Sequence, residues 1–283
     1  MKIDLHTHSK VSDGTDSPTS VVMQAIAAGL DVIALTDHDT FDGLKEAKEA
    51  GRRVGLTVLG GIEMSTVKDG HSVHLLGYGC DTSYTPLREE LARIRVGRME
   101  RLPEMCRRLT EAGLEITVDE VRETALWSPA VGRPHVADTL VKKGYVVNRR
   151  EAFDKWLEEG KPGFVTRYAC PLERAIDLIH DAKGVAVIAH PWGRQGRAVM
   201  TAEYLELLVR NHELEGIEVD HEDHDEDARS LLFDLGARLG LVRTGSSDFH
   251  GTGKEGHPLG VNLTRPSAYR DLVNRIRRRG GTL

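Results

Sequence analysis

Residues 2–14 read KIDLHTHSKVSDG, and this stretch decides how the rest of the chain is interpreted. The KIDLH portion alternates polar and apolar side chains, which predicts a β-strand. His6 and His8 then lie on the same side of the extended chain, where two imidazoles can bind one cation. A turn-like SDG sequence follows, so Asp13 can fold back towards them. These residues alone leave open an ordinary edge strand with surface histidines.

The composition indicates a globular protein with a large core. The chain has 283 residues, of which 40% are apolar, enough for one α/β barrel or for a core with an insertion. No apolar run is long enough to cross a membrane, and the N-terminus lacks the pattern of an export signal. The formal charge of -6 argues against a protein that coats duplex nucleic acid through a broad basic surface.

The cysteines favour a reducing compartment. Cys80, Cys106 and Cys170 are far apart, odd in number and outside any CxxC pair. We therefore expect reduced thiols in a cytoplasmic protein.

Strand-like and helix-like segments alternate over most of the chain. Beyond the first strand, the segments expected to form strands are residues 32–37, 57–65, 73–79, 184–191, 216–220 and 241–250. The amphipathic segments expected to form helices are residues 18–28, 41–53, 172–182, 202–212 and 226–239. Several strands are apolar nearly throughout, as expected when both faces are covered. The alternation predicts an α/β fold with parallel strands and helical crossovers.

The alternation stops between residues 85 and 166. Long helical runs follow one another here, among them LREELARIRVGRMERLPEMCRRLTEAG and RPHVADTLVKKG. We therefore expect a barrel built from residues 1–84 and 167–283, with residues 85–166 as a helical insertion that contributes to substrate binding. A pair of strands mistaken for helices is the alternative.

Polar side chains recur at the ends of the expected strands. They are His6, His8, Asp37, His38, Asp39, Glu63, His74, His190, Asp248 and His250. All lie at or near a C-terminal strand end, except that His74 is nearer the start of its strand. In parallel barrels this edge collects the catalytic groups. One such residue alone is more often a cap or a core group, but their recurrence indicates a shared site.

The side-chain types indicate a multinuclear metal centre. Imidazole and carboxylate without thiolate suit Mn²⁺, Fe²⁺ or Zn²⁺ and disfavour a structural cysteine–zinc site. The candidates outnumber the ligands of one tetrahedral ion. Two or three ions that share a bridging carboxylate are implied.

The motifs in chain order resemble those of the PHP family, named for polymerase and histidinol phosphatase domains. They are DLHTHSKVSDG, ALTDHDT, GIEMS, HLLGY, AHPWG and SDFHG. The GRPH sequence at residues 132–135 resembles a branch of bacterial nucleotide phosphoesterases that includes 3′,5′-nucleotide bisphosphate phosphatases and a 5′→3′ exoribonuclease. The resemblance implies a distorted (β/α)₇ barrel with three divalent metal ions, Mn²⁺ first, with Fe²⁺ or Zn²⁺ as alternatives.

The resemblance also implies which residues bind each ion. The first ion would be bound by His6, His8, Glu63 and Asp248, the second by Asp13, His38 and His250, and the third by Glu63, His74 and His190. Glu63 would therefore bridge two ions. An aspartate at position 13, where some relatives have histidine, fits the nucleotide-cleaving branch.

Such a centre needs no side-chain nucleophile. Ions about 3.5–4 Å apart can share one water and lower its pKa, which gives a bridging hydroxide near neutral pH. Asp37 and Asp39 flank His38 and either orient ring nitrogens or, for Asp39, cap a helix. His221, His224 and a metal-bound water all remain candidates for the acid that protonates the leaving group.

The insertion supplies candidates for substrate binding. Arg98 and Arg101 are three residues apart and share one helix face, although a solvated basic face is the alternative. Pro134 fits the first turn of a helix, which places Arg133 and His135 at its positive N-terminus, a typical anion site. The nucleotide-cleaving branch implies the same two regions for substrate binding.

Other polar residues are weaker candidates. Arg194 and Arg197 follow His190 and are more often ordinary loop charges. Residues expected to be surface or packing histidines are His71, His180, His212 and His257.

The resemblance implies a metal-dependent phosphoesterase that acts on nucleotides. The expected reactions are removal of the 3′ phosphate from nucleoside 3′,5′-bisphosphates and 5′→3′ trimming of short 5′-monophosphorylated RNA. The expected partners are a small nucleotide or short single-stranded RNA, with neither duplex nucleic acid nor a membrane. A histidinol phosphatase and a non-catalytic PHP module are the alternatives.

Overall fold

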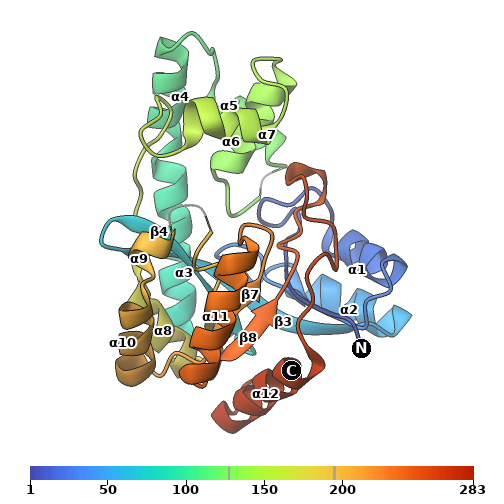
Figure 1. Ribbon diagram of the computed structural model, residues 1–283. Coiled ribbons are helices and arrows are strands. Elements are labelled where there is room, and N and C mark those ends of the chain that lie inside the picture. The colour runs from blue at the N-terminus through green and yellow to red at the C-terminus, as the bar shows by residue number, and fades with distance from the viewer. Residues whose placement is uncertain (127, 194–195) are drawn as a thin grey trace.

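Seven strands form one sheet that curves into a nearly closed barrel surrounded by helices (Figure 1). The computed structural model describes residues 1–126, 128–193 and 196–283. In sheet order the strands are β1 (Ile3–Thr7), β2 (Val32–Leu35), β3 (Thr57–Lys68), β4 (His71–Tyr78), β6 (Val185–Ile188), β7 (Gly216–Asp220) and β8 (Val242–Gly245). A two-residue strand, β5 (Cys170–Pro171), pairs with β3 outside this order. The predicted (β/α)₇ barrel is confirmed.

Strand β4 departs from the parallel arrangement that the sequence predicts. It runs antiparallel to both β3 and β6. Only Asp69 and Gly70 separate the paired residues Lys68 and His71, and both have positive φ angles, of 50° and 84°. A two-residue turn of this kind joins antiparallel strands, whereas parallel strands need a longer crossover. The early residues of β4 therefore lie at the edge where the other strands end, which explains the position of His74.

Helices cover the outside of the barrel. They are α1 (Pro18–Ala27), α2 (Leu44–Val54), α8 (Leu172–Asp181), α9 (Gly196–Val199), α10 (Ala202–His212), α11 (Glu226–Arg238), α12 (Pro266–Arg279) and the 3₁₀ turn η2 (Gly251–Gly253). Among the described residues, none of the helices is both long and apolar enough to span a membrane.

Helix α12 was not among the predicted helices. Its sequence is rich in arginine, and only Leu272 and Ile276 of its residues are buried. These two side chains pack with strand residues such as Ile3 and Leu5 and so cover the base of the barrel. Tyr269, Leu272 and Ile276 recur at helical spacing, a signal that the sequence analysis passed over among the arginines of this segment.

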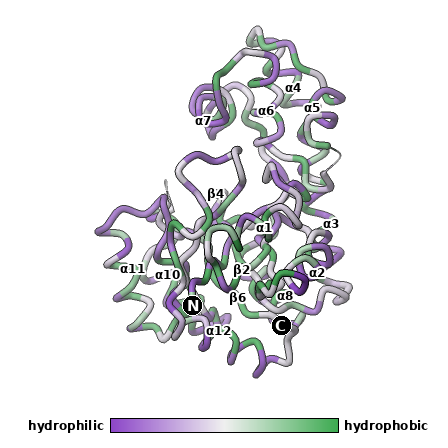
Figure 2. The backbone as a smooth tube through the Cα atoms, turned by 90° about the vertical axis from the view of Figure 1, so that its right-hand side faces the viewer, coloured by the Kyte–Doolittle hydropathy of each residue, from purple (hydrophilic) through white to green (hydrophobic). Residues whose placement is uncertain are grey.

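The region between β4 and β5 is helical, as predicted. Its elements are α3 (Thr85–Glu100), α4 (Leu102–Glu111), α5 (Val118–Thr124), α6 (Arg133–Lys142), α7 (Arg149–Ala152) and the π-helical turn η1 (Phe153–Leu157). Helices α4–α7 form a separate lobe, and α3 connects this lobe to the barrel (Figures 1 and 2).

The lobe has its own hydrophobic core. Leu87, Leu91 and Ile94 of α3 pack into the core of the barrel. Buried apolar residues between Leu102 and Leu157 form a second cluster. The division of the two cores therefore falls within the segment predicted as the insertion, and the boundaries at residues 85 and 166 stay predictions.

Candidate metal centre

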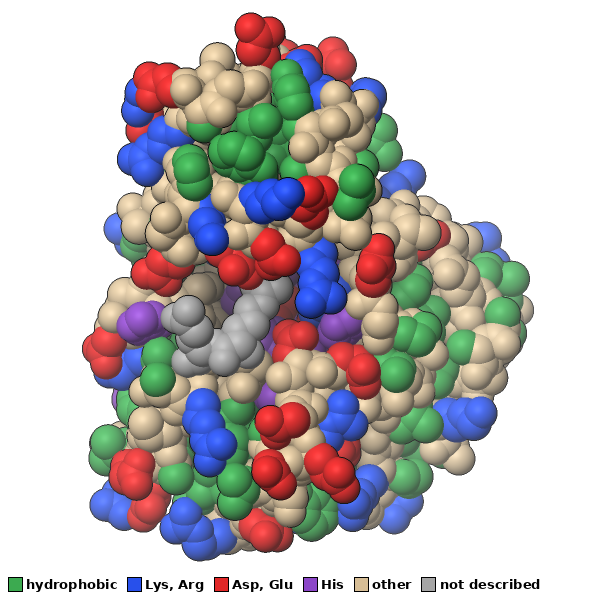
Figure 3. Space-filling model, turned by 45° about the horizontal axis from the view of Figure 1, so that its top comes forward, with side chains coloured by type: hydrophobic (Ala, Val, Ile, Leu, Met, Phe, Trp, Pro, Cys, Tyr) green, Lys and Arg blue, Asp and Glu red, His purple; other side chains and the backbone are tan. Residues whose placement is uncertain are grey.

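The candidate metal ligands converge at the barrel edge that faces the lobe, and histidine side chains are visible in the groove between the two parts (Figure 3). This edge is formed by the C-terminal ends of the parallel strands and the first half of β4. The candidates, taken in chain order, are His6, His8, Asp13, His38, Glu63, His74, His190, Asp248 and His250. All of them are buried except His74 and His190, which are partly exposed.

The four residues predicted to bind the first ion form a compact cage. Nε2 of His6 and Nε2 of His8 lie 3.0 Å apart. Glu63 Oε2 and Asp248 Oδ1 lie between 3.1 and 3.4 Å from these two nitrogens. Ligands at about 2.0–2.1 Å from a tetrahedral Zn²⁺ are about 3.3–3.4 Å apart. The cage therefore has the dimensions that a divalent cation requires.

A polar atom in this cage is left without a partner by the protein itself. Asp248 Oδ1 is buried and accepts no hydrogen bond from any described residue. A buried carboxylate oxygen without a partner is costly, and a bound cation would satisfy it. The residues present thus fit a metal ion at this position.

The second group brings together Asp13, His38 and His250. Asp13 Oδ1 lies 3.3 Å from His250 Nε2, and Asp13 Oδ2 lies 3.6 Å from His38 Nε2. The ring of His8 stacks on that of His250 with a centroid distance of 4.1 Å, so the first and second groups are adjacent.

The third group is arranged around the other oxygen of Glu63. Oε1 of Glu63 lies 2.9 Å from His74 Nδ1 and 3.3 Å from His190 Nε2. Because Oε2 faces the first cage, the two oxygens of one carboxylate face two different groups. This geometry is that of a bridging ligand.

Glu218 supports the centre and was missed by the sequence analysis. Its Oε1 lies 3.3 Å from His6 Nδ1, and its Oε2 accepts a hydrogen bond of 2.9 Å from the backbone N–H of His190. Such a carboxylate fixes the tautomer and orientation of a ligating histidine. The available signal was an acidic residue inside the otherwise apolar strand GIEVD.

Asp37 and Asp39 do not have the predicted roles. Asp37 accepts hydrogen bonds of 2.7 Å from Ser9 N, Ser9 Oγ and Ser12 Oγ, so it holds the loop after β1. Asp39 accepts from Ser65 N at 2.7 Å and pairs with Arg98. Neither makes a hydrogen bond to a histidine ring among the described residues. Asp39 does not cap α2 either, because the N-cap of that helix is residue 43.

The two histidines proposed as leaving-group acids have no free ring nitrogen. His221 Nδ1 accepts from Asp223 N at 3.0 Å, and its Nε2 lies 3.3 Å from Asp248 Oδ2. His224 Nδ1 lies 2.8 Å from Val219 O, and its Nε2 accepts from Trp192 N at 3.2 Å. Both rings therefore hold local structure.

Histidines expected to be structural have mixed surroundings. His71 is exposed, His180 lies 2.9 Å from Glu215, and His212 lies 3.0 Å from Asp177. His257 is buried beside His221, with Nδ1 at 2.7 Å from Ser247 O. None of these four belongs to the three predicted ligand groups, but ligand atoms of His257, His221 and Asp248 lie within 4.8 Å of one another and form a further group that could hold a cation.

Burial and charge together keep the carboxylates of the centre ionised. Burial raises the pKa of Glu63, but the imidazoles of His38, His74 and His6 outweigh burial and hold this pKa well below its usual range. His38 and His250 have the same effect on the pKa of Asp13. Ionised carboxylates buried this deeply require positive charge nearby, which protons on histidines or bound cations can provide.

Cation binding at the first cage is expected to release a proton. Burial opposes the charge of His8, yet the adjacent carboxylates of Asp248 and Glu63 raise the pKa of this ring to about 9. A cation can bind Nε2 only after the ring is deprotonated. Below this pKa the proton competes with the cation, so the affinity for Mn²⁺ should fall as the pH drops from about 9 towards 7, by up to about tenfold per unit.

Calorimetric titrations with Mn²⁺ in buffers of different ionisation enthalpy would count the protons released. We expect about one more proton per chain near pH 7 than above pH 9. An affinity and proton count that stay constant across this range would contradict the assignment.

Four guanidinium groups gather between the centre and the lobe, from Arg98, Arg101, Arg133 and Arg167. Arg98 is 5% exposed, and its Nη2 lies 2.7 Å from Asp39 Oδ2 and 2.7 Å from Ser65 Oγ. Arg101 is 7% exposed and makes no ion pair with any described residue. Its Nε is buried without a hydrogen-bond partner.

The mutual repulsion of these cations appears in their pKa values. Burial, and then Arg98 and Arg133, lower the pKa of Arg167 to about 9. Burial, and then Arg167, Arg133 and Arg98, also lower the pKa of Arg101. Cations this close and this buried favour an anionic ligand. Arg167 was missed by the sequence analysis, because it lies 34 positions beyond Arg133 without a surrounding motif.

The GRPH segment begins α6, as predicted. Arg133 lies 5.6 Å from the ring centroids of both Phe153 and Phe164, and its Nη1 donates to Leu157 O at 3.3 Å. His135 Nδ1 accepts from the backbone N–H of residue 132 at 3.0 Å and so caps the helix, which leaves its Nε2 for other contacts. The weaker candidate Arg194 lies outside the described residues, and Arg197 stacks on Trp192.

Comparison with known proteins identifies the family. A family model described as PHP domain matches residues 4–84. Over 280 residues the chain is 36% identical to a 3′,5′-nucleoside bisphosphate phosphatase of Chromobacterium violaceum, covering 98% of this chain and 97% of the relative. The chain belongs to the PHP family. It is also 35% identical to a 5′-3′ exoribonuclease of Haemophilus influenzae, covering 88% of this chain and 90% of the relative.

Solved structures of PHP-like proteins agree with this assignment. A protein of Bifidobacterium adolescentis described as a metal-dependent phosphoesterase matches with a TM-score of 0.92 and 34% identity, over 96% of each chain. An amidohydrolase of Chromobacterium violaceum matches with a TM-score of 0.86 and 35% identity, over 97% of each chain. With these relatives and the ligand groups described above, the chain is a PHP hydrolase that acts on phosphoester bonds.

Proposed function

We propose that this PHP enzyme hydrolyses the 3′-phosphoester of a nucleotide that carries a 5′ phosphate. Its substrates would be nucleoside 3′,5′-bisphosphates and the 5′ end of short RNA, and its product a 5′-mononucleotide. The observation that carries this proposal is the position of a buried arginine cluster beside the candidate metal centre. Two anion-binding regions match a substrate with two phosphates. The names of the two relatives, a bisphosphate phosphatase and an exoribonuclease, support the same substrate class.

We propose three divalent cations, with Mn²⁺ first. The support is the presence of three ligand groups of mixed imidazole and carboxylate type, around one carboxylate whose oxygens face two of them. Bound there, the cations would supply a water of lowered pKa as the nucleophile and neutralise charge on the reacting phosphoryl group.

The protein's own side chains would then orient the substrate. Arg101, Arg133 and Arg167 would bind the 5′ phosphate at a fixed distance from the cations, so that the 3′-phosphoester is the bond presented to them. Lys254 contacts Asp248 at the edge of the first cage and is partly exposed, so it would face the reacting phosphoryl group. With His221 and His224 engaged in hydrogen bonds, no histidine is assigned to protonate the leaving group.

We also infer a cytoplasmic location. All three cysteines are free and buried. Burial raises the pKa of the Cys80 thiol to about 12, which makes it unreactive. Such cysteines are typical of a reducing compartment.

A substrate comparison tests the proposal. With Mn²⁺ supplied, kcat/KM should be highest for adenosine 3′,5′-bisphosphate. It should be about one to two decades lower for 3′-AMP, which lacks the charge-assisted contacts at the 5′ position. 5′-AMP should be a poor substrate. The highest kcat/KM for histidinol phosphate would overturn the proposal in favour of a histidinol phosphatase.

A further inference from the structure

The loop that carries Asp13, residues 9–14, is bonded to the helical lobe through its backbone. Ser128 Oγ lies 2.7 Å from Val11 O and 2.9 Å from Ser12 O. Arg149 Nη1 donates to Asp13 O at 3.0 Å. The Ser128 hydroxyl, which has one proton to donate, is thus within hydrogen-bond reach of two consecutive peptide carbonyls of this loop, and Arg149 donates to the third; both side chains lie more than a hundred positions away. Buried backbone carbonyls need such partners, so the loop depends on the lobe for its conformation.

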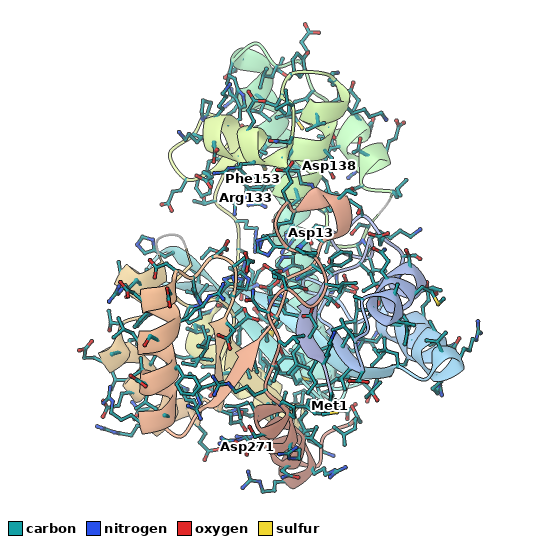
Figure 4. All side chains as sticks on the ribbon, turned by 45° about the vertical axis from the view of Figure 1, so that its right-hand side comes forward. Met1, Asp13, Arg133, Asp138, Phe153 and Asp271 are labelled. Carbon is teal, nitrogen blue, oxygen red and sulfur yellow. The ribbon has the colours of Figure 1, made fainter. Side chains whose placement is uncertain are left out.

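Arg149 is held in place by a second residue of the lobe. Its Nε and Nη2 each lie 2.6 Å from one oxygen of Asp138 on α6. This paired contact fixes the plane of the guanidinium and leaves Nη1 directed at Asp13 O. The Arg149 side chain is only 12% exposed. Figure 4 shows Asp138 above Asp13, at the junction of the lobe and the barrel.

Arg149 also covers the segment that carries His250. A Cβ atom at Gly253 would lie 2.2 Å from Arg149 Nη1, so any side chain here would displace the guanidinium from its present position. The backbone N–H of Thr15 donates to His250 O at 3.2 Å, which joins this segment to the Asp13 loop. One arginine therefore touches two of the three segments that bring candidate ligands to the second group, those of Asp13 and His250.

We propose that Arg149 is a positioning residue for the second cation site. By joining Asp138 of the lobe to Asp13 O, and by packing on Gly253, it holds Asp13 and His250 at the separation that a cation needs. The lobe, through Arg149 and Ser128, is thus part of the structure that forms this site. The proposal rests on the proposed cation sites but not on the identity of the substrate.

The test counts Mn²⁺ bound to the full-length protein, with free Mn²⁺ measured by electron paramagnetic resonance. Arg149→Met should weaken one class of bound Mn²⁺ by about 10–100-fold and leave the others unchanged, as expected when a partner that only orients a ligand is lost. Arg149→Lys keeps the positive charge but cannot make the paired contact with Asp138, so it should restore this affinity only in part. Arg150→Met is the matched control, because Arg150 is the next residue of α7 and its side chain is 85% exposed.

A second background separates positioning from a general loss of structure. Because Arg149 acts mainly through Asp13, Arg149→Met should lower Mn²⁺ affinity much less once Asp13→Asn is present than it does in the wild type, with the remainder arising from the His250 segment. An equal loss in the two backgrounds would overturn the proposal, as would unchanged Mn²⁺ binding in the folded single variant. If Arg149→Met does not fold, the Mn²⁺ affinities of Ser128→Ala and Arg149→Lys are measured instead. Both should then show a weakened class of bound Mn²⁺, and unchanged affinity in both would overturn the proposal. Wild-type protein that binds one Mn²⁺ or fewer would instead refute the proposed metal centre.

Discussion

Glu63→Gln is expected to abolish hydrolysis and to remove more than one cation from each chain. The two oxygens of Glu63 face different ligand groups, so one substitution removes a negative charge from both. The loss of activity should exceed about a hundredfold, the upper range for residues that merely orient a ligand. Elemental analysis after reconstitution with Mn²⁺, together with kcat/KM on one nucleotide substrate, would measure both effects.

His74→Gln should have a smaller effect than Glu63→Gln on both cation content and activity. His74 approaches only Oε1 of Glu63, in the third group, so its substitution should cost a single cation and less activity. Glu218→Gln should reduce cation affinity more mildly. Glu218 contacts His6 but is not itself one of the candidate ligands. Equal cation content in Glu63→Gln and the wild type would disprove the bridging role.

The second large effect concerns the arginine cluster. Arg133→Ala should lower kcat/KM for adenosine 3′,5′-bisphosphate by about one to two decades, because charge-assisted hydrogen bonds are worth about 1.5–3 kcal/mol. Hydrolysis of 3′-AMP should change little, since that substrate lacks the 5′ phosphate. Cation content should stay at the wild-type value. Steady-state kinetics on the two substrates measure the ratio directly.

Arg101→Met adds a stability readout to the same experiment. Arg101 is buried without an ion pair among the described residues, and its Nε has no hydrogen-bond partner. Replacing an uncompensated buried charge by an apolar side chain of similar length should raise Tm while it weakens binding of the bisphosphate. Arg107→Met is the matched control, because Arg107 lies on α4 and is paired with Glu104 and Glu111. Unchanged discrimination between the two substrates in Arg101→Met and Arg133→Ala would remove the cluster from the binding site.

The sequence alone named the imidazole and carboxylate side chains that the fold brings together as candidate metal ligands. His6, His8, Glu63 and Asp248 could be named because each lies at or near the end of an expected strand and because the motifs that carry them resemble those of the PHP family. The helical character of the lobe was equally visible, because amphipathic periodicity is a local property of the chain.

The tertiary structure decided how these residues are paired. Glu218, Arg149 and Arg167 show no periodicity or motif of their own, and their roles arise from contacts with residues distant in the sequence. The antiparallel direction of β4 depends on the two-residue turn that joins it to β3. The alternation of strands and helices along the sequence had predicted a parallel strand instead. Periodicity reports the environment of one segment, whereas hydrogen bonds and charge clusters depend on which segments the fold brings together. The sequence therefore determined which imidazole and carboxylate side chains are available, and the fold determined which of them meet and which charged side chains lie beside them.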